Sequence, residues 1–183
     1  MDQLPVPLPE AAAHSHRLSE SLRSRIADAG GSIPFADFMA QALYAPGLGY
    51  YTAGARKFGS AGDFVTSPEM TGLFGEALAR QVAEIMRLSA PCILEIGAGS
   101  GRLAADLLAT LDASGALPDR YLILDLSADL RQRQRETLAA AVPHLLPRVE
   151  WIDCLPEQFS GVVLGNELLD AMPASVVAWR EDG

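Results

Sequence analysis

The apolar residues of the first half of the chain recur at helical spacing. Within residues 17–29, leucine and isoleucine return every fourth position until Gly30-Gly31, a pair typical of helix ends. A second apolar stripe, within residues 34–45, follows a proline suited to the first turn of a helix. Two amphipathic helices are therefore predicted. They are preceded by a loose tail over residues 1–16, where several prolines disfavour regular structure.

A long loop and a longer helix are predicted next. Residues 46–67 contain aromatic side chains such as Tyr50 and Phe64, which disordered connectors usually lack. Loops of this length inside compact domains are often functional. The helix that follows carries an apolar face, and Thr66 and Glu69 have the spacing of a capping box, with Ser67 as the alternative cap.

From Pro91 onward, short apolar runs alternate with helical stretches. This alternation predicts the α/β class: a Rossmann-like domain with a partial parallel sheet and an N-terminal helical extension. The predicted regions are a tail (1–16), a helical region with its loop (17–90) and the Rossmann-like core (91–183). Strands are expected at Cys92–Ile96, Tyr121–Leu126, Val149–Ile152, Val162–Leu164 and Ser175–Trp179, with helices at Arg102–Leu111 and Leu130–Ala141.

Composition excludes several classes of function. The net charge of -9 and the pI near 4.7 disfavour a nucleic-acid surface, which needs clustered Lys and Arg. No apolar run has the length of a membrane span, and the N-terminus lacks the pattern of a signal peptide. Cys92 and Cys154 are predicted to be free thiols in a reducing compartment. No metal site is predicted, because His14 and His16 lack acidic or cysteine companions.

The run from Glu95 to Gly101 carries the candidate chemistry. A predicted strand enters a turn with the spacing G-x-G-x-G, formed by Gly97, Gly99 and Gly101, and a predicted helix leaves it. Ligands of open α/β sheets bind beyond the carboxyl ends of the strands. A dinucleotide site would have its third glycine at position 102, which is Arg102 here. The acid at Glu95 would repel a pyrophosphate and suits a cationic ligand such as S-adenosylmethionine.

Two further acids follow predicted strands. Asp125 could accept hydrogen bonds from both ribose hydroxyls, although either Asp125 or Ser127 could instead cap the next helix. Asp153 could reach an adenine amino group, or it could be an ordinary turn acid. Thr66 and Ser67 are a further candidate contact, since a helix N-terminus there could face the carboxylate of the cofactor.

With these residues in place, the chain resembles the MidA-like (DUF185) family of class I S-adenosylmethionine-dependent methyltransferases. One departure is Asp125, where the family usually places glutamate. The resemblance runs from about residue 33 to the end, and its most specific stretches are Gly62-Asp63-Phe64-Val65-Thr66-Ser67-Pro68-Glu69 and Asn166-Glu167-Leu168-Leu169-Asp170-Ala171-Met172-Pro173.

The resemblance implies methylation of a protein, with arginine as the residue modified by the mitochondrial member that acts in respiratory complex I assembly. It therefore implies a respiratory-complex subunit as one class of partner. The site of action would be the cytoplasm in a bacterium or the mitochondrial matrix in a eukaryote. Asn166 and Glu167 are predicted to contact the substrate, with Asp170 in support. Asn166 could instead cap a helix, and Asp170 could be a plain surface acid.

Family members are about twice this length, and a turn signal at the C-terminus follows the last predicted strand. The chain is therefore expected to be an incomplete methyltransferase fold. Two alternatives remain open at this point. The first is a cofactor-binding assembly factor or scaffold without catalysis, and the second is an NAD-dependent oxidoreductase, which Arg102 disfavours.

Overall fold

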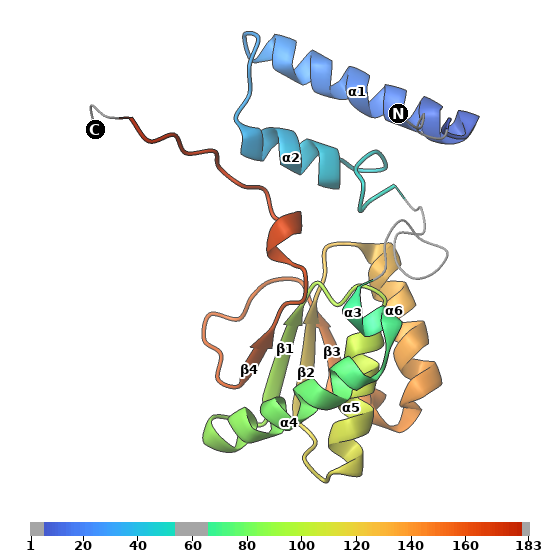
Figure 1. Cartoon of the computed structure of the whole chain (residues 1–183), viewed down its shortest axis with the longest axis vertical. Coiled ribbons are helices and arrows are strands. Elements are labelled where there is room, and N and C mark those ends of the chain that lie inside the picture. The colour runs from blue at the N-terminus through green and yellow to red at the C-terminus, as the bar shows by residue number, and fades with distance from the viewer. Residues whose placement is uncertain (1–5, 54–65, 181–183) are drawn as a thin grey trace, which may run out of the picture. The chain divides into compact units, whose positions relative to one another are not determined.

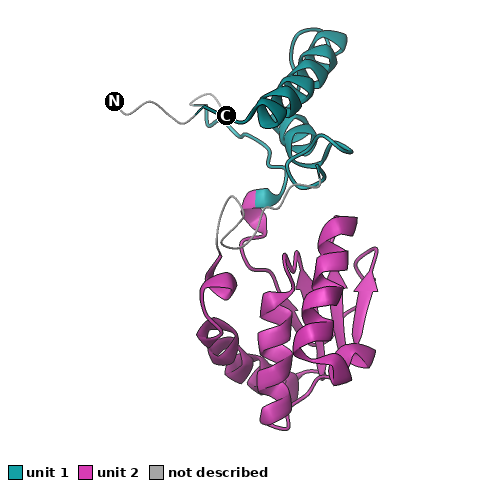
Figure 2. Ribbon diagram, turned by 90° about the vertical axis from the view of Figure 1, so that its right-hand side faces the viewer, with its two compact units in different colours: residues 1–55, 171–183 teal, residues 56–170 magenta. Residues whose placement is uncertain are grey.

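The computed structural model describes residues 6–53 and 66–180, which fall into two compact units (Figure 2). The first unit comprises residues 1–55 and 171–183, and the second comprises residues 56–170. Each is described by itself. None of the helices within the described ranges is long and apolar enough to cross a membrane.

The first unit contains the two predicted N-terminal helices, α1 (Pro9–Asp28) and α2 (Phe35–Tyr44), which pack against each other. The prediction of a loose tail is wrong for residues 9–16. There α1 begins with a proline at a position that needs no N–H donor, and Ala11, Ala12 and Ala13 follow it. These strong helix formers let the helix begin at Pro9, eight residues before the predicted start at residue 17.

The C-terminal segment of the first unit contradicts the expected strand at Ser175–Trp179. Residues 173–180 have no regular secondary structure, and Val176, Val177 and Trp179 are exposed. A strand needs a neighbour to satisfy its backbone groups, and in the described ranges none pairs with this segment. Apolar composition alone therefore did not make it a strand. Instead, the Tyr44 hydroxyl donates to the Ala171 carbonyl at 2.7 Å.

The second unit is a parallel four-stranded sheet in the order β3-β2-β1-β4 (Figure 1). Both crossovers, β1-α5-β2 and β2-α6-β3, step in the same direction across this sheet, so right-handed connections place α5 and α6 on one face. The elements are β1 (Cys92–Ile96), α5 (Arg102–Ala113), β2 (Arg120–Leu124), α6 (Ala128–Ala141), η1 (Pro143–Arg148), β3 (Val149–Ile152) and β4 (Val162–Leu164). The short η2 (Leu169–Ala171) begins in this unit and ends at Ala171, the first residue of the C-terminal segment of the first unit.

A single apolar core lies between the sheet and its helices. Ile93, Tyr121 and Ile123 face it from the strands, and Leu107 and Leu138 face it from α5 and α6. The parallel α/β arrangement confirms the predicted fold class. Parallel strands carry their carboxyl ends to the same edge, so the residues after β1, β2, β3 and β4 gather there.

The long helix predicted from Thr66 is two helices in the structure, α3 (Ser67–Met70) and α4 (Leu73–Leu88). Thr71 is extended and its hydroxyl accepts from the Leu73 amide at 3.2 Å, which ends one helix and starts the other. Helix α4 packs along α5 and therefore belongs to the second unit. The capping box is also absent: Thr66 is the N-cap of α3, but its side chain makes no capping hydrogen bond.

Candidate functional site

The glycine turn connects β1 to α5 as the sequence predicted. Gly97, Gly99 and Gly101 all have positive φ, at 71°, 56° and 84°. The Gly97 amide donates to the Leu124 carbonyl at 2.9 Å, which ties the start of the turn to the end of β2. Gly101 is the N-cap of α5. The turn therefore presents backbone at the sheet edge with no side chain of its own at three positions.

Gly101 is required for a second reason, which is close helix packing. A Cβ atom at this position would lie 2.9 Å from the Cα of Gln134 in α6. Gly97 is also approached, because a Cβ there would lie 3.1 Å from Cδ1 of Leu168. The turn is thus enclosed by α6 on one side and by the segment after β4 on the other.

Glu95 is buried next to this turn, with 2% of its surface exposed. The Tyr121 hydroxyl donates to Oε2 of Glu95 at 2.8 Å. Burial raises the pKa of Glu95 to about 7; the Tyr121 hydrogen bond opposes this shift in pKa and the charge of Asp125 adds to it. Glu95, the acid that was predicted to suit a cationic ligand, is therefore largely protonated below neutral pH. One of its oxygens is already occupied by the hydrogen bond from Tyr121.

Asp125 lies at the end of β2 and is held at both oxygens. Oδ1 accepts from the Ser127 amide at 3.0 Å, and Oδ2 accepts from Nε2 of Gln134 at 2.8 Å. Burial raises the pKa of Asp125, and these hydrogen bonds act in the opposite direction. The N-cap of α6 is Ser127, whose hydroxyl oxygen accepts from the Leu130 amide at 3.3 Å. Ser127, and not Asp125, is therefore the residue that caps α6. The carboxylate of Asp125 keeps lone pairs that can accept hydrogen bonds from a ligand.

Gln134 is a site residue that the sequence analysis missed. It is fully buried in α6, and its Nε2 donates both to Asp125 and to the Gly99 carbonyl, the latter at 3.1 Å. Its Oε1 accepts from Nε1 of Trp151 in β3 at 2.9 Å. One amide therefore joins the glycine turn, the tip of β2 and β3. A helical repeat of Leu130, Gln134 and Leu138 was the available signal, because it places this polar residue on the inward face.

Asp153 follows β3 but has a different environment. Its side chain is 88% exposed and pairs with Nη1 of Arg131 at 2.7 Å. Nη2 of Arg131 donates to the Ile152 carbonyl at 2.6 Å. Like Asp125 and Gly101, Asp153 is not among the residues that line the cavity at the glycine turn. The structure therefore shows a solvent-facing ion pair where the sequence suggested an adenine contact.

The segment after β4 brings Asn166 to the glycine turn. Glu167 has a φ of 51°, a left-handed conformation that is uncommon outside glycine and that clusters at functional sites. Leu168 lies against Gly97 and Gly165 and anchors the segment. Glu167 and Asp170 are exposed and do not line the cavity. Of the three predicted catalytic residues, the structure therefore brings only Asn166 into the cavity.

A cavity at the sheet edge is bounded by the glycine turn, the start of α5 and helix α3. Thr66 lines it and Ser67, which is exposed, does not. No group of three metal-binding side chains occurs in the parts of the chain that the structure describes. The lining residues are Thr66, Pro68, Glu69, Glu95, Gly97, Ala98, Gly99, Ser100, Arg102, Leu103 and Asn166.

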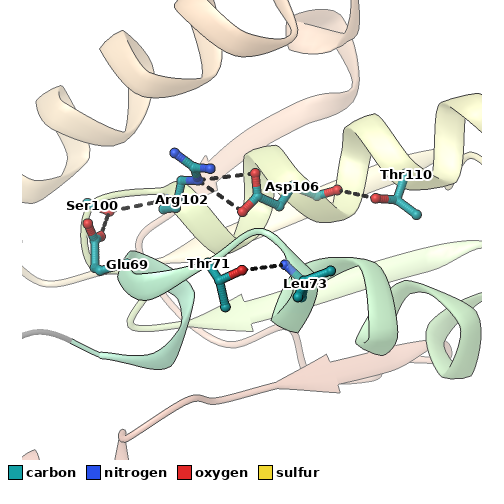
Figure 3. Close-up of polar contacts among 7 residues, drawn as sticks. All are labelled: Glu69, Thr71, Leu73, Ser100, Arg102, Asp106 and Thr110. Carbon is teal, nitrogen blue, oxygen red and sulfur yellow. Dashed lines mark hydrogen bonds and ion pairs between the residues drawn. The ribbon is translucent and has the colours of Figure 1, made fainter.

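Two charged residues that line this cavity, Glu69 and Arg102, were not predicted as site residues; Figure 3 shows their polar contacts. Glu69 of α3 accepts a hydrogen bond from the Ser100 hydroxyl. Arg102, the first residue of α5, pairs through Nε with both oxygens of Asp106, at 3.1 and 2.9 Å. Gly75 of α4 allows this arrangement, since a Cβ there would lie 2.6 Å from the Cβ of Asp106.

Comparison with known proteins identifies the family. The model of a family described as "Putative S-adenosyl-L-methionine-dependent methyltransferase" matches residues 77–183. The mitochondrial protein arginine methyltransferase NDUFAF7 homolog of Drosophila melanogaster is 32% identical over 90% of this chain and 44% of its own length. The Danio rerio NDUFAF7 protein is 30% identical over 92% of this chain and 46% of its own length.

A solved structure agrees with these sequence matches. The crystal structure of a COG1565 superfamily member from Burkholderia thailandensis bound to S-adenosyl-homocysteine aligns with a TM-score of 0.88 and 55% identity. The alignment covers 93% of this chain and 46% of that one, so the chain spans less than half the length of these relatives. Because the family model covers more than half of its residues, the chain belongs to this MidA-like family of S-adenosylmethionine-dependent methyltransferases.

Proposed function

We propose that this chain binds S-adenosylmethionine at the glycine turn and provides the cofactor side of a methyltransferase that acts on a protein. The observation that carries the proposal is the cavity lined by Gly97 and Gly99, two glycines with positive φ, with Asp125 held at the neighbouring strand tip. A carboxylate with both oxygens oriented and lone pairs to spare suits a pair of ribose hydroxyls. The Burkholderia relative, 55% identical, was crystallised with S-adenosyl-homocysteine.

The proposed contacts are those predicted from the sequence, but Asp153 is now proposed as a weaker contact. Glu95, Gly97 and Gly99 line the site, Gly101 supports the turn from its place at the start of α5, and Asp125 is proposed for the ribose. Asp153 is proposed for the adenine amino group as the weaker contact, because its carboxylate already pairs with Arg131. Thr66 is proposed to face the amino-acid end of the cofactor, and Ser67 acts only through its place at the start of α3.

The reaction is a displacement in line with the sulfonium. When bound, adenosylmethionine would supply an electrophilic methyl group and leave as S-adenosylhomocysteine. The substrate nitrogen would have to lie opposite the carbon–sulfur bond and give up a proton to solvent. Such alignment can contribute about 7–11 kcal/mol. Asn166 lies in the cavity wall, next to Glu167 with its left-handed backbone. We place the substrate nitrogen at these two residues, with Asp170 in support.

Arginine of a partner protein is the proposed substrate side chain, as in the curated relatives named arginine methyltransferases. A guanidinium arrives charged and presents planar N–H groups that a carboxylate can bind through two hydrogen bonds. The exposed Glu167 suits this role because a partner protein can reach it. The bacterial source of the solved relatives favours the cytoplasm as the place of action.

Calorimetric titration tests the cofactor proposal. S-adenosylhomocysteine, S-adenosylmethionine and NAD are titrated separately into the chain, with the Burkholderia relative as a positive control. Binding of the first two without NAD supports the proposal. Binding of NAD alone, or of none of the three, contradicts it. For the substrate residues, Glu167→Gln should reduce transfer of a labelled methyl group to an arginine-containing partner, and undiminished transfer would remove Glu167 from the site.

A second function, cofactor binding without catalysis, has one observation in its favour. Glu167 and Asp170 lie outside the cavity, so the described residues of the second unit form a cofactor site more completely than a substrate site. A protein of this kind would bind S-adenosylhomocysteine and transfer no label to any partner. The titration and the transfer assay together separate the two functions.

A further inference from the structure

Resting on the proposed function, we infer that Arg102 and Glu69 read the two opposite charges at the amino-acid end of the cofactor. Arg102 would bind the carboxylate, and Glu69 would bind the ammonium. Both residues line the cavity beside the glycine turn, and they reach it from different helices, α5 and α3. This assigns a role to the arginine that stands where a dinucleotide site would have its third glycine.

Arg102 is half-exposed, and its guanidinium is held on one side by an ion pair with Asp106. Within the described residues its side-chain hydrogen bonds involve only Nε, which donates to the carboxylate of Asp106 one helical turn later. Both terminal nitrogens of the guanidinium therefore keep their N–H groups for another acceptor. Asp106 is itself confined, because α4 packs against it at Gly75. A planar donor pair held in this way matches a carboxylate.

Glu69 is placed for the opposite charge. Its Oε1 accepts from the Ser100 hydroxyl within the glycine turn, which orients the carboxylate towards the cavity. Oε2 takes part in no hydrogen bond within the described ranges and can accept from an ammonium group. Glu95 is a poorer partner for that ammonium, because it is buried and its Oε2 accepts from Tyr121. The residue that reads the positive charge is thus on α3, outside the glycine motif.

The test compares three ligands that share the thioadenosine part and differ at the amino-acid end, titrated into the whole chain. S-adenosylhomocysteine carries both charges, its decarboxylated analogue keeps only the ammonium, and methylthioadenosine has neither. Arg102→Gln should weaken binding of S-adenosylhomocysteine by about tenfold or more and change the other two by less than about twofold. Glu69→Gln should weaken the first two ligands by a similar factor and spare methylthioadenosine.

Controls separate recognition from general damage to the fold. Arg80→Gln and Glu76→Gln remove the same charges from exposed positions of α4 and should leave all three affinities unchanged. Arg102→Lys keeps the charge and should retain part of the preference for S-adenosylhomocysteine over the decarboxylated analogue. Thermal unfolding of each variant shows whether it is folded.

Two results would overturn the inference while leaving the proposed function intact. One is equal binding of S-adenosylhomocysteine and its decarboxylated analogue by the unsubstituted chain. The other is an equal loss for all three ligands in the Arg102 and Glu69 variants, which would indicate a purely structural role. If the unsubstituted chain binds none of the three ligands while the Burkholderia relative does, the proposed function fails and the inference falls with it.

Discussion

The acids at the ends of β1 and β2 differ from the acids that follow β3 and β4, although all of them lie at the same edge of the sheet. Glu95 and Asp125 are held by the buried partners Tyr121 and Gln134. Asp153 and Glu167 face solvent. A position at the end of a strand therefore makes a residue only a candidate for ligand binding. Whether its carboxylate is oriented before a ligand binds depends on the hydrogen-bond partner behind it. Fixed groups suit a small cofactor, and exposed groups suit a partner that brings its own surface.

The largest effect is expected from removing the buried amide that holds the first pair of strand tips together. Gln134→Leu leaves the Gly99 carbonyl, Asp125 and the Trp151 indole without the partner they share. Because each buried polar group left unpaired costs about 1–3 kcal/mol, we expect the free energy of unfolding to fall by about 4 kcal/mol. Urea denaturation measures this change. Gln132→Leu, on the exposed side of the same helix, is the control and should change stability little.

If Gln134→Leu proved no more harmful than the Gln132→Leu control, the distinction between held and exposed acids would lose its main support. The same variant should also weaken binding of S-adenosylhomocysteine, because Asp125 would no longer be oriented. A stable variant with unchanged affinity would show that Asp125 finds its direction without help from α6.

The second prediction concerns the pH dependence of stability, which should report on Glu95. Its pKa in the folded chain is about 7, against an ordinary value of about 4.3. Since the folded chain binds the extra proton between these values, the stability from this group is complete below about pH 4.3. It is lost as pH rises to about 7, a change of about 4 kcal/mol. Glu95→Gln should abolish this slope and be the more stable protein at pH 8.

Urea denaturation of both proteins at several pH values between 4 and 8 measures the difference between the two slopes. The difference isolates Glu95 from the other titrating groups of the chain. Parallel slopes would mean that Glu95 ionises like an exposed acid, and the contrast between the two halves of the sheet edge would then not extend to β1.

A third prediction tests how tightly the glycine turn is enclosed. Gly101→Ala forces a side chain into a left-handed backbone and against α6, and should cost about 2 kcal/mol of unfolding free energy. Gly115→Ala is a matched control, because Gly115 has a similar φ of 68° with no atom within 4 Å of an added Cβ. It should cost about 1 kcal/mol. Equal costs would show that the contact with Gln134 does not constrain the turn.

The smallest effects are expected from substituting the acids that follow β2 and β3, and they concern the affinity for S-adenosylhomocysteine. Asp125→Asn replaces an acceptor that receives two N–H donors and should weaken S-adenosylhomocysteine about tenfold, or about 1.4 kcal/mol. Asp153→Asn should change affinity by less than about threefold and stability by less than about 1 kcal/mol, because exposed ion pairs contribute little. Calorimetry measures both. A larger loss from Asp153→Asn would establish the adenine contact that the sequence suggested.

Periodicity and glycine spacing were sufficient to predict the parallel sheet and the turn. The strands Cys92–Ile96, Val149–Ile152 and Val162–Leu164 were predicted with their observed bounds, since continuous apolar runs between turns match buried parallel strands. The expected strand at Ser175–Trp179 failed because pairing depends on a neighbour, which a local pattern does not contain. The start of α1 was missed because prolines were taken as helix breakers, whereas Pro9 occupies the first turn.

Sequence analysis predicted the site residues that lie within one motif or directly at a strand end better than those brought together from distant parts of the chain. Glu95, Asp125 and the three glycines were found because they are adjacent in sequence to strand ends. Gln134, Tyr121 and Glu69 were missed because their roles arise from contacts between elements 26 to 35 residues apart. No single-sequence pattern encodes such contacts. A polar residue on the inward face of α6 was the one available clue.

Because Trp151 is hydrogen-bonded to Gln134, tryptophan fluorescence can report on the glycine turn. The chain has two tryptophans, and Trp179 is 98% exposed, so iodide in solution should quench its fluorescence. Trp151 donates to the amide that also reaches the glycine turn, and the guanidinium of Arg135 lies 4.3 Å from its ring. The emission that survives the quencher would therefore come from an indole two hydrogen bonds away from the turn. A structural change at the glycine turn could then be measured by intrinsic fluorescence, without an added label.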